Sequence, residues 1–387
     1  CGSTGTRHWH LAVRFACWSQ SCFADRNQDK ITNINSNQIW NSFLILLGDV
    51  EPGLLGITLT HEHLAMDFTH FYRKPPTSIA KNFNDPFSLN NVGYIRQYPY
   101  SHRSNLVLND DSANAAVYND IKEYKVCGGG TIVENSTHGL ERDIEFFKEV
   151  AEETDVNIIA GTGFYIEDTQ PGDVVNYFKE ELYNHMMKEL TEHCQDHASV
   201  KAGFIGEVAS VWPIRDFERK AIIAAGEVQE QVGCGVSFHP HRHPDAPFEI
   251  IRLYLEAGGK ADKAVMSHLD RTLLDPEKLL SFSELGTYCQ FDLFGIEVSY
   301  YQLNAQTDMP SDAQRIEMIR RLVAEGRVDK VLMSHDIHTK HRLIDFGGHG
   351  YSHIITNVLP RMKSKGFTQA QIDQITVTNP ATWLTIQ

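Results

Sequence analysis

Two histidines separated by one residue, His61 and His63, are the first side chains in this sequence whose types and spacing indicate chemistry. The apolar residues before them, Ile57 and Leu59, are typical of a buried strand. Side chains alternate between the two faces of a strand, so both imidazoles should point to one side and Glu62 to the other. Two imidazoles at the carboxyl end of a strand form half of a metal site, although such pairs also occur as hydrogen-bonded histidines without a metal.

Residues that could complete this site follow later apolar runs, at positions that read as the ends of strands. These residues are Glu134, Glu207, His239, His268, Asp292 and Asp336. A single histidine or aspartate in such a place is more often a cap, but agreement among five or six runs points to a shared metal centre. A catalytic zinc ion takes about three protein ligands, so the set is large enough for two ions roughly 3.5–4 Å apart.

We expect the ligands to divide between a more buried and a more exposed ion. The expected ligands of the buried ion are His61, His63 and Asp336, and those of the exposed ion are His239 and His268. A carboxylate from the fourth strand should bridge them, with Glu207 favoured and Glu134 as its rival. Lys201 is a poor bridge, because at about 3.3 Å per residue it lies roughly 20 Å from the end of that strand.

These ligands need elements that bring the ends of distant strands together. Helical periods alternate with the apolar runs, at about 112–126, 139–153, 174–194, 216–232, 246–257, 276–285 and 311–325. Eight strand-like runs separated by helices predict an α/β fold, the (β/α)8 TIM barrel, with the ligands at the carboxyl ends of the strands. A doubly wound open sheet is the alternative, but no glycine-rich phosphate turn follows the first strand.

Two segments fall outside this alternation. Residues 1–44 show no clear period, and we expect a disordered or artefactual extension there and the barrel in residues 45–387. The chain starts with Cys, and its first Met, Met66, follows the histidine pair, so we expect a fragment or a foreign leader. Residues 67–110 are polar, aromatic and proline-containing, which predicts a functional loop or lid.

The composition narrows the classes of partner. The chain of 387 residues has 50 acidic and 35 basic side chains and a net charge of -15, which argues against nucleic acid and anionic membranes as partners. No apolar run reaches the roughly 18 residues of a transmembrane helix. Seven scattered cysteines without a CxxC pair are typical of reduced thiols. We therefore expect a cytoplasmic protein that acts on a small molecule.

Several stretches resemble the phosphotriesterase family of the amidohydrolase superfamily from about Gly48 to the C-terminus. They include LTHEHLAM (59–66), GGGTIVEN (128–135), IGEVASVWP (205–213), VMSHLDRTLLD (265–275) and HDIHTKHRL (335–343). The resemblance implies two divalent metal ions, expected to be Zn²⁺, on the ligands His61, His63, Glu207, His239, His268 and Asp336. Several bacterial members bridge their metals with a carboxylated lysine, where this chain has the shorter Glu207. A homodimer is the default oligomeric state that the same resemblance implies.

The resemblance also implies a reaction. Members of the animal branch are associated with hydrolysis of N-acetyltaurine and related N-acyl amino acids, here by a metal-bridging hydroxide whose proton Asp336 would take up. Asp336 could instead be a plain ligand. Two other functions stay open, which are hydrolysis of phosphotriesters or lactones at the same centre and binding of a partner by a catalytically inactive barrel.

Substrate contacts are expected from a few residues beyond the ligands. Tyr165 follows the third strand and could line the pocket or belong to the core. A sulfonate or carboxylate on the substrate needs one or two cations near the mouth, for which Arg242, Arg271 and Lys340 are candidates. His241 and His243 are interpreted as loop residues, because prolines flank the pair.

Overall fold

Eight parallel strands follow one another around the sheet in the order in which they occur along the chain. They are β3 (Ile57–Glu62), β4 (Gly129–Glu134), β5 (Asn157–Thr162), β6 (Phe204–Ala209), β7 (Val236–His239), β8 (Ala264–Met266), β9 (Tyr288–Phe291) and β10 (Val331–Met333). This computed structural model describes residues 43–45, 48–50, 52–298 and 301–386, so most of the predicted N-terminal extension lies outside the described residues.

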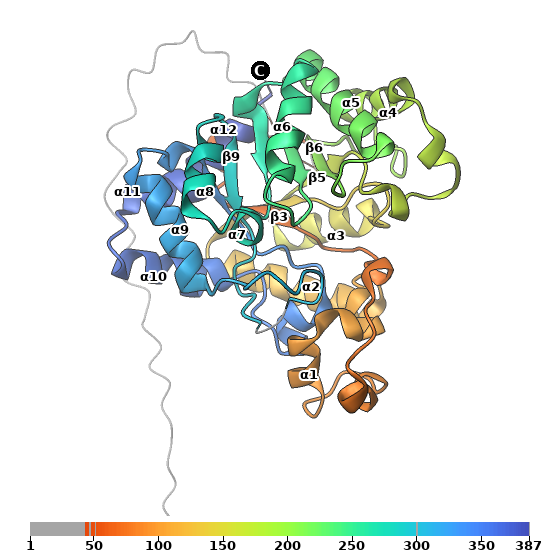
Figure 1. Cartoon of the computed structure of the whole chain (residues 1–387), viewed down its shortest axis with the longest axis vertical. Helices are drawn as coiled ribbons and strands as arrows, with labels where there is room; N and C mark the ends of the chain where they lie inside the picture. Colours follow the sequence, from red (N-terminus) through yellow and green to blue (C-terminus); the bar gives the residue numbers. More distant parts are fainter. Residues whose placement is uncertain (1–42, 46–47, 51, 299–300, 387) are drawn as a thin grey trace, which may run out of the picture. The chain divides into compact units, whose positions relative to one another are not determined.

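Helices alternate with these strands and lie outside the sheet (Figure 1). The longer ones are α2 (Asp111–Val126), α3 (Ile144–Thr154), α4 (Lys179–Thr191), α5 (Asp216–Val232), α6 (Ala246–Glu256), α8 (Pro276–Ser283) and α9 (Asp312–Ala324). The predicted TIM barrel is thereby confirmed. No helix among the described residues combines the length and the apolar character needed to cross a membrane.

The first and last strands meet at a seam that Glu62 holds together. The amide of Asp336 donates to the carbonyl of His61 over 3.1 Å. Beside this bond, the Glu62 carboxylate accepts from the Ser334 hydroxyl at 2.7 Å and from the amides of His335 and Ile337 at 2.8 and 3.0 Å. Glu62 therefore points away from the histidine pair, as strand alternation predicts.

A small apolar cluster joins residues from six different strands, a set that only the inside of a closed sheet can bring together. Its members include Val133, Ile159, Phe204, Val265, Tyr288 and Leu332. Trp383 of α12 (Asn379–Leu384) packs on this cluster with its ring 5.6 Å from that of Phe204. Burial of so many large side chains supplies a rigid base for the opposite, carboxyl end of the barrel.

The structure changes several predicted boundaries. Helix α3 begins at Ile144 rather than 139, because Gly139 and Glu141 have positive φ angles of 96° and 54° and Asp143 caps the amide of Phe146. Helix α5 has the predicted bounds. Helix α4 is shorter at both ends than predicted.

Residues 67–110 are less irregular than predicted. They contain α1 (Val92–Gln97) and short 3₁₀ turns, and isolated bridging between Asp67 and Val107 ties the two ends of the segment together. At the N-terminal side, β1 (Phe43–Ile45) pairs with β2 (Gly48–Val50), so the predicted domain border after residue 44 falls within a strand.

Candidate metal centre

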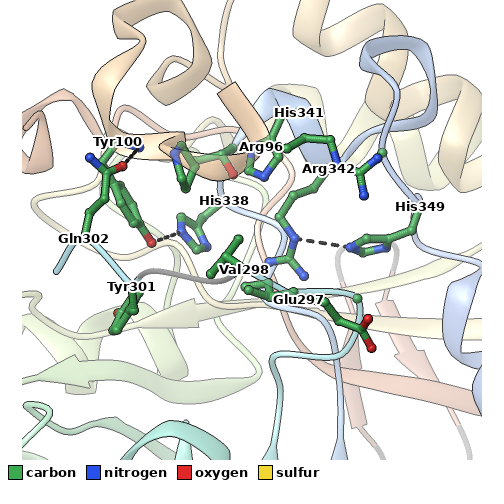
Figure 2. A pocket seen from close by; sticks show the side chains of 15 residues that line it. Arg96, Tyr100, Glu297, Val298, Tyr301, Gln302, His338, His341, Arg342 and His349 are labelled. Carbon is green, nitrogen blue, oxygen red and sulfur yellow. Dashed lines mark hydrogen bonds between the residues drawn. The ribbon is translucent and has the colours of Figure 1, made fainter. Parts of the chain in front are cut away.

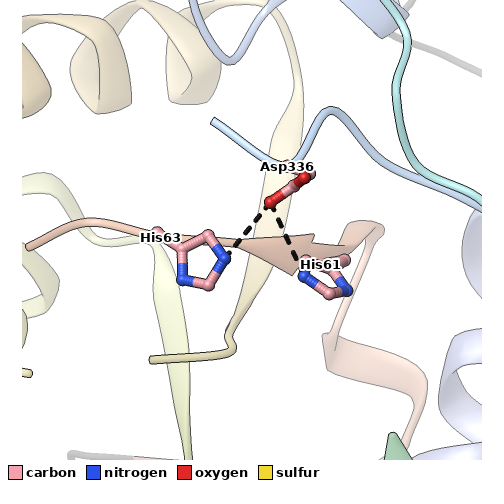
Figure 3. Close-up of side chains that lie close together, drawn as sticks. All are labelled: His61, His63 and Asp336. Atoms are coloured by element: carbon pink, nitrogen blue, oxygen red, sulfur yellow. Dashed lines mark ion pairs between the residues drawn. The ribbon is translucent and has the colours of Figure 1, made fainter. Parts of the chain in front are cut away.

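The structure brings the predicted ligands together at the carboxyl end of the barrel in two groups of three. In the first, Oδ1 of Asp336 lies 3.2 Å from Nε2 of His63 and 3.7 Å from Nε2 of His61 (Figure 3). In the second, Nδ1 of His239 lies 2.7 Å from Oε2 of Glu207 and 2.9 Å from Nε2 of His268. All of these residues are buried.

The Glu207 carboxylate faces both groups. Its Oε2 lies 3.4 Å from Nε2 of His61, and its Oε1 lies 3.6 Å from Nε2 of His63. The rival Glu134 is occupied elsewhere, because it accepts from the Leu64 amide at 3.1 Å and the Ser136 hydroxyl at 2.6 Å. The position expected of a bridge is therefore taken by Glu207.

Two of these side chains come from residues with strained backbones just beyond their strands. His268 and Asp336 have φ angles of 58° and 56°, in the left-handed region that costs a non-glycine residue roughly 1–2 kcal/mol. This conformation turns the chain immediately after β8 and β10 and sends each side chain into the cluster. Such strain is maintained where the surrounding structure fixes one geometry.

Neighbouring polar groups fix the orientation of three of the imidazoles through their Nδ1 atoms. Ser267 Oγ lies 3.0 Å from Nδ1 of His61, and Ser136 Oγ lies 3.0 Å from Nδ1 of His63. Asp292 holds Nδ1 of His268 at 2.7 Å. Contacts of this kind orient metal ligands and set their tautomers, and here they leave Nε2 facing the cluster.

Burial keeps three of the histidines, His61, His239 and His268, neutral. It lowers the pKa of His61 to about 3, although the carboxylates of Asp292 and Asp336 oppose this shift. It also lowers the pKa of His239 and His268 well below the usual value. Neutral imidazole is the form that binds metals.

The two carboxylates of the cluster differ. Burial, reinforced by Asp336 and Asp292, raises the pKa of Glu207 well above its usual value. Burial also favours protonation of Asp336, but His338, His63 and His268 together outweigh this and hold its pKa well below the usual range. A buried carboxylate with a raised pKa lacks a compensating cation.

A further observation indicates that these side chains suit divalent cations. Nε2 of His61 is buried and makes no hydrogen bond within the part of the chain that the structure describes. A buried polar atom without a partner is costly, and a metal bond would remove that cost. Four imidazoles around two carboxylates are a set of ligands that suits zinc.

A small cavity opens over the cluster. Tyr165, Arg242 and Arg271, three of the four predicted substrate contacts, line it. The Tyr165 hydroxyl lies 3.5 Å from Nε2 of His239, and Nη2 of Arg271 lies 3.3 Å from the same nitrogen.

The fourth predicted contact, Lys340, does not line this cavity, because its ammonium group pairs with Asp110. His241 and His243 also stay outside both ligand groups. The His243 ring stacks on Trp212 at 5.0 Å, in the turn after β7. Both histidines are loop residues, as interpreted from the flanking prolines.

Sequence reasoning missed residues that reach the cavity from loops. Tyr100, Tyr301 and His338 line both this cavity and a second one beside it. Figure 2 shows Tyr100 and His338 joined by a hydrogen bond of 3.1 Å in that second cavity. The spacing of His338 two residues after Asp336 was an available signal, whereas nothing in the local sequence marks Tyr100 or Tyr301.

Comparisons with known proteins agree with this geometry. The model of the phosphotriesterase family matches residues 41–384. Phosphotriesterase-related proteins of Drosophila mojavensis and Drosophila melanogaster are each 56% identical to this chain over 340 residues, which cover 88% of this chain and 97% of each relative.

Solved structures share the fold. The phosphotriesterase homology protein of Escherichia coli, complexed with phosphate in its active site, is 26% identical with a TM-score of 0.70, over 87% of this chain and 100% of that one. A resiniferatoxin-binding protein of Rhodobacter sphaeroides is 24% identical with a TM-score of 0.83, over 89% and 95% of the two chains. From the family match and the identity over nearly the whole length of its relatives, this chain belongs to the phosphotriesterase family of metal-dependent hydrolases.

Proposed function

We propose that this protein cleaves the amide bond of N-acetyltaurine or a related N-acyl amino acid with the help of two divalent cations, preferably zinc. His61, His63 and Asp336 would hold one ion, His239 and His268 the other, and Glu207 both. The position of the Glu207 carboxylate, within 3.9 Å of a nitrogen of all four histidines, is the observation that carries the proposal.

A bound pair of divalent cations supplies an acidified water and polarises the oxygen of the scissile group. The chain's own residues then have separate tasks. Asp336, whose pKa lies well below the usual range, stays ionised at neutral pH and can accept the proton of the attacking water. His338 holds the Asp336 carboxylate in place, with Nδ1 at 3.3 Å from Oδ2.

The arginine side chains in the cavity favour a substrate with a negative charge. Arg242 and Arg271 line the same cavity as the cluster, and Arg271 is buried. A buried guanidinium without a carboxylate partner is suited to the sulfonate or carboxylate of a ligand. Among the described residues neither arginine forms an ion pair within 4 Å, whereas Lys340 does.

Ester hydrolysis is a second candidate with an observation in its favour. The Escherichia coli relative holds phosphate in its active site, and phosphate has the tetrahedral shape of a hydrolysed triester. The same ligands and the same Asp336 would serve a phosphotriester or a lactone. The distinction therefore rests on how the rest of the substrate fits the cavity.

Direct assay separates the candidates. The zinc-loaded protein is incubated with N-acetyltaurine, N-acetyl amino acids, a lactone panel and paraoxon, and product release is followed in each case. We expect turnover of the N-acyl compounds. Turnover of only the lactones or the triester would make the amide assignment wrong, and stoichiometric metal without turnover of any compound would favour a barrel that only binds a partner.

A further inference from the structure

A second cluster of metal-binding side chains lies apart from the centre described above. His138, in the loop after β4, faces His185 and Glu189, which lie four residues apart on α4. Nε2 of His138 lies 2.7 Å from Nε2 of His185. Both nitrogens lie 3.5 Å from Oε1 of Glu189. None of these residues takes part in the proposed reaction.

The triangle of these three atoms has the size of a zinc site. A point in its plane lies about 1.9 Å from each atom, and moving it about 0.8 Å out of the plane gives the roughly 2.0–2.2 Å of Zn–N and Zn–O bonds. Two histidines and one glutamate are also a ligand set known from zinc sites that keep one position open.

The exposure of the three side chains is consistent with a metal ion that keeps one position open to solvent. The His138 and His185 side chains are 22% and 15% exposed and line a groove, whereas Glu189 is 1% exposed. Oε2 of Glu189 is buried and makes no hydrogen bond within the described part of the chain. An ion could therefore enter from the groove. Oε1 of Glu189 already accepts from Arg142 and from the Gln195 amide, so the free acceptor capacity of this carboxylate lies at Oε2.

The charges around the cluster also permit a cation. Arg142 donates to Glu189 Oε1 over 2.7 Å, but it is also paired with Asp196 at 2.7 Å. Glu189, Asp196 and Arg142 together leave one negative charge. Burial lowers the pKa of His138, so its imidazole is available in the neutral form that binds metals.

We propose that His138, His185 and Glu189 form an additional mononuclear site for zinc or a similar cation that prefers imidazole, with its open position toward the groove. The site would tie the loop after β4 to helix α4. This loop supports the catalytic end of the barrel, because Thr137 donates its hydroxyl to the Glu207 carbonyl at 3.1 Å and the Tyr165 amide donates to the His138 carbonyl at 3.0 Å. The inference does not depend on the proposed reaction.

Zinc stoichiometry tests the site directly. The full chain, its His185→Gln variant and its His193→Gln variant are dialysed against buffered Zn²⁺, and bound zinc is measured by mass spectrometry. His193 is the matched control, because it follows the same helix but belongs to none of the ligand groups. We expect the wild type and His193→Gln to hold one more zinc ion per chain than His185→Gln.

The difference in zinc content between the wild type and its variants tests this site regardless of how many ions the first centre binds. Equal zinc content in the wild type and His185→Gln, or in the wild type and a His138→Gln variant measured in the same way, would overturn the proposal and leave the two imidazoles as a hydrogen-bonded pair. A second test uses only the wild-type protein, so that it does not depend on whether the variants fold. Zn²⁺ should protect His138 and His185, but not His193, from diethyl pyrocarbonate, and absence of this protection would also overturn the site.

Discussion

At the scale of single residues, the Glu207 carboxylate is the group that faces all four histidines of the cluster. It lies between 2.7 and 3.9 Å from nitrogens of His61, His63, His239 and His268, and burial raises its pKa. A glutamate needs no added carbon dioxide to serve as a bridge, unlike the carboxylated lysine of several bacterial relatives.

Asp336→Asn should separate metal binding from proton transfer. The amide keeps one oxygen for the ion but cannot accept a proton, so we expect bound zinc to persist while kcat falls by about 10²–10⁴-fold. Bound metal and kcat are measured on the same sample. A metal-loaded Asn variant with the wild-type kcat would reduce Asp336 to a plain ligand.

Arg242→Gln should affect binding of an anionic substrate. Loss of one charged hydrogen bond costs about 1.4 kcal/mol or more, so KM for an N-acyl amino acid should rise at least about tenfold, with little change for its uncharged amide. Arg252→Gln is the matched control, because Arg252 pairs with Glu249 and Glu256 on the surface of α6. An equal rise in KM for charged and uncharged substrates would argue against this role.

At the scale of elements, the seam between β3 and β10 explains why the ligands from opposite ends of the chain meet. Glu62 on β3 accepts hydrogen bonds from Ser334, His335 and Ile337 after β10, and Asp336, which lies between His335 and Ile337, thereby comes beside His61. Side-chain alternation on β3 gives His61 to the site and Glu62 to the seam.

Glu62→Gln should weaken this seam. The variant loses the charge that accepts several buried donors, and we expect a loss of roughly 2–3 kcal/mol in the free energy of unfolding. Glu152→Gln on the exposed face of α3 is the control, with an expected change within about 0.5 kcal/mol. Both are measured by urea unfolding of the metal-loaded protein, and equal stability of the two variants would contradict the assigned role.

At the scale of the whole molecule, the residues that stabilise the barrel and the candidate metal ligands lie in different parts of it. The apolar cluster that includes Phe204 and Trp383 fills its interior, while buried polar and charged side chains gather at the carboxyl end. Gathering neutral imidazoles and carboxylates without solvent costs free energy, which bound cations would offset.

Removal of the metals should therefore lower the melting temperature while leaving the fold intact. A ligand present at about a thousand times its Kd stabilises the native state by about 4 kcal/mol. We expect a chelator to lower the Tm and to leave the far-ultraviolet circular dichroism spectrum nearly unchanged, and added zinc to restore the Tm. An unchanged Tm after complete removal of metal would show that the cluster is stable without cations.

The amino-acid sequence by itself determined the alternation of strands and helices and the set of ligand types at the strand ends. Helix α5 has the predicted bounds, and His61 and His63 share a face, because both follow from periods within a few neighbouring residues. The order of the candidate ligands along the chain was enough to expect them together at one end of the barrel, because each strand of a TIM barrel contributes its carboxyl end to the same site.

Only the tertiary structure decided which side chains reach the cavity from loops and which are occupied elsewhere. Lys340 is paired with Asp110, and Tyr100 meets His338 across 238 positions of sequence. The left-handed turns at His268 and Asp336 were likewise not visible, because a strand pattern ends without showing how the chain leaves it. Such contacts depend on the path of loops through space, which local periodicity does not encode.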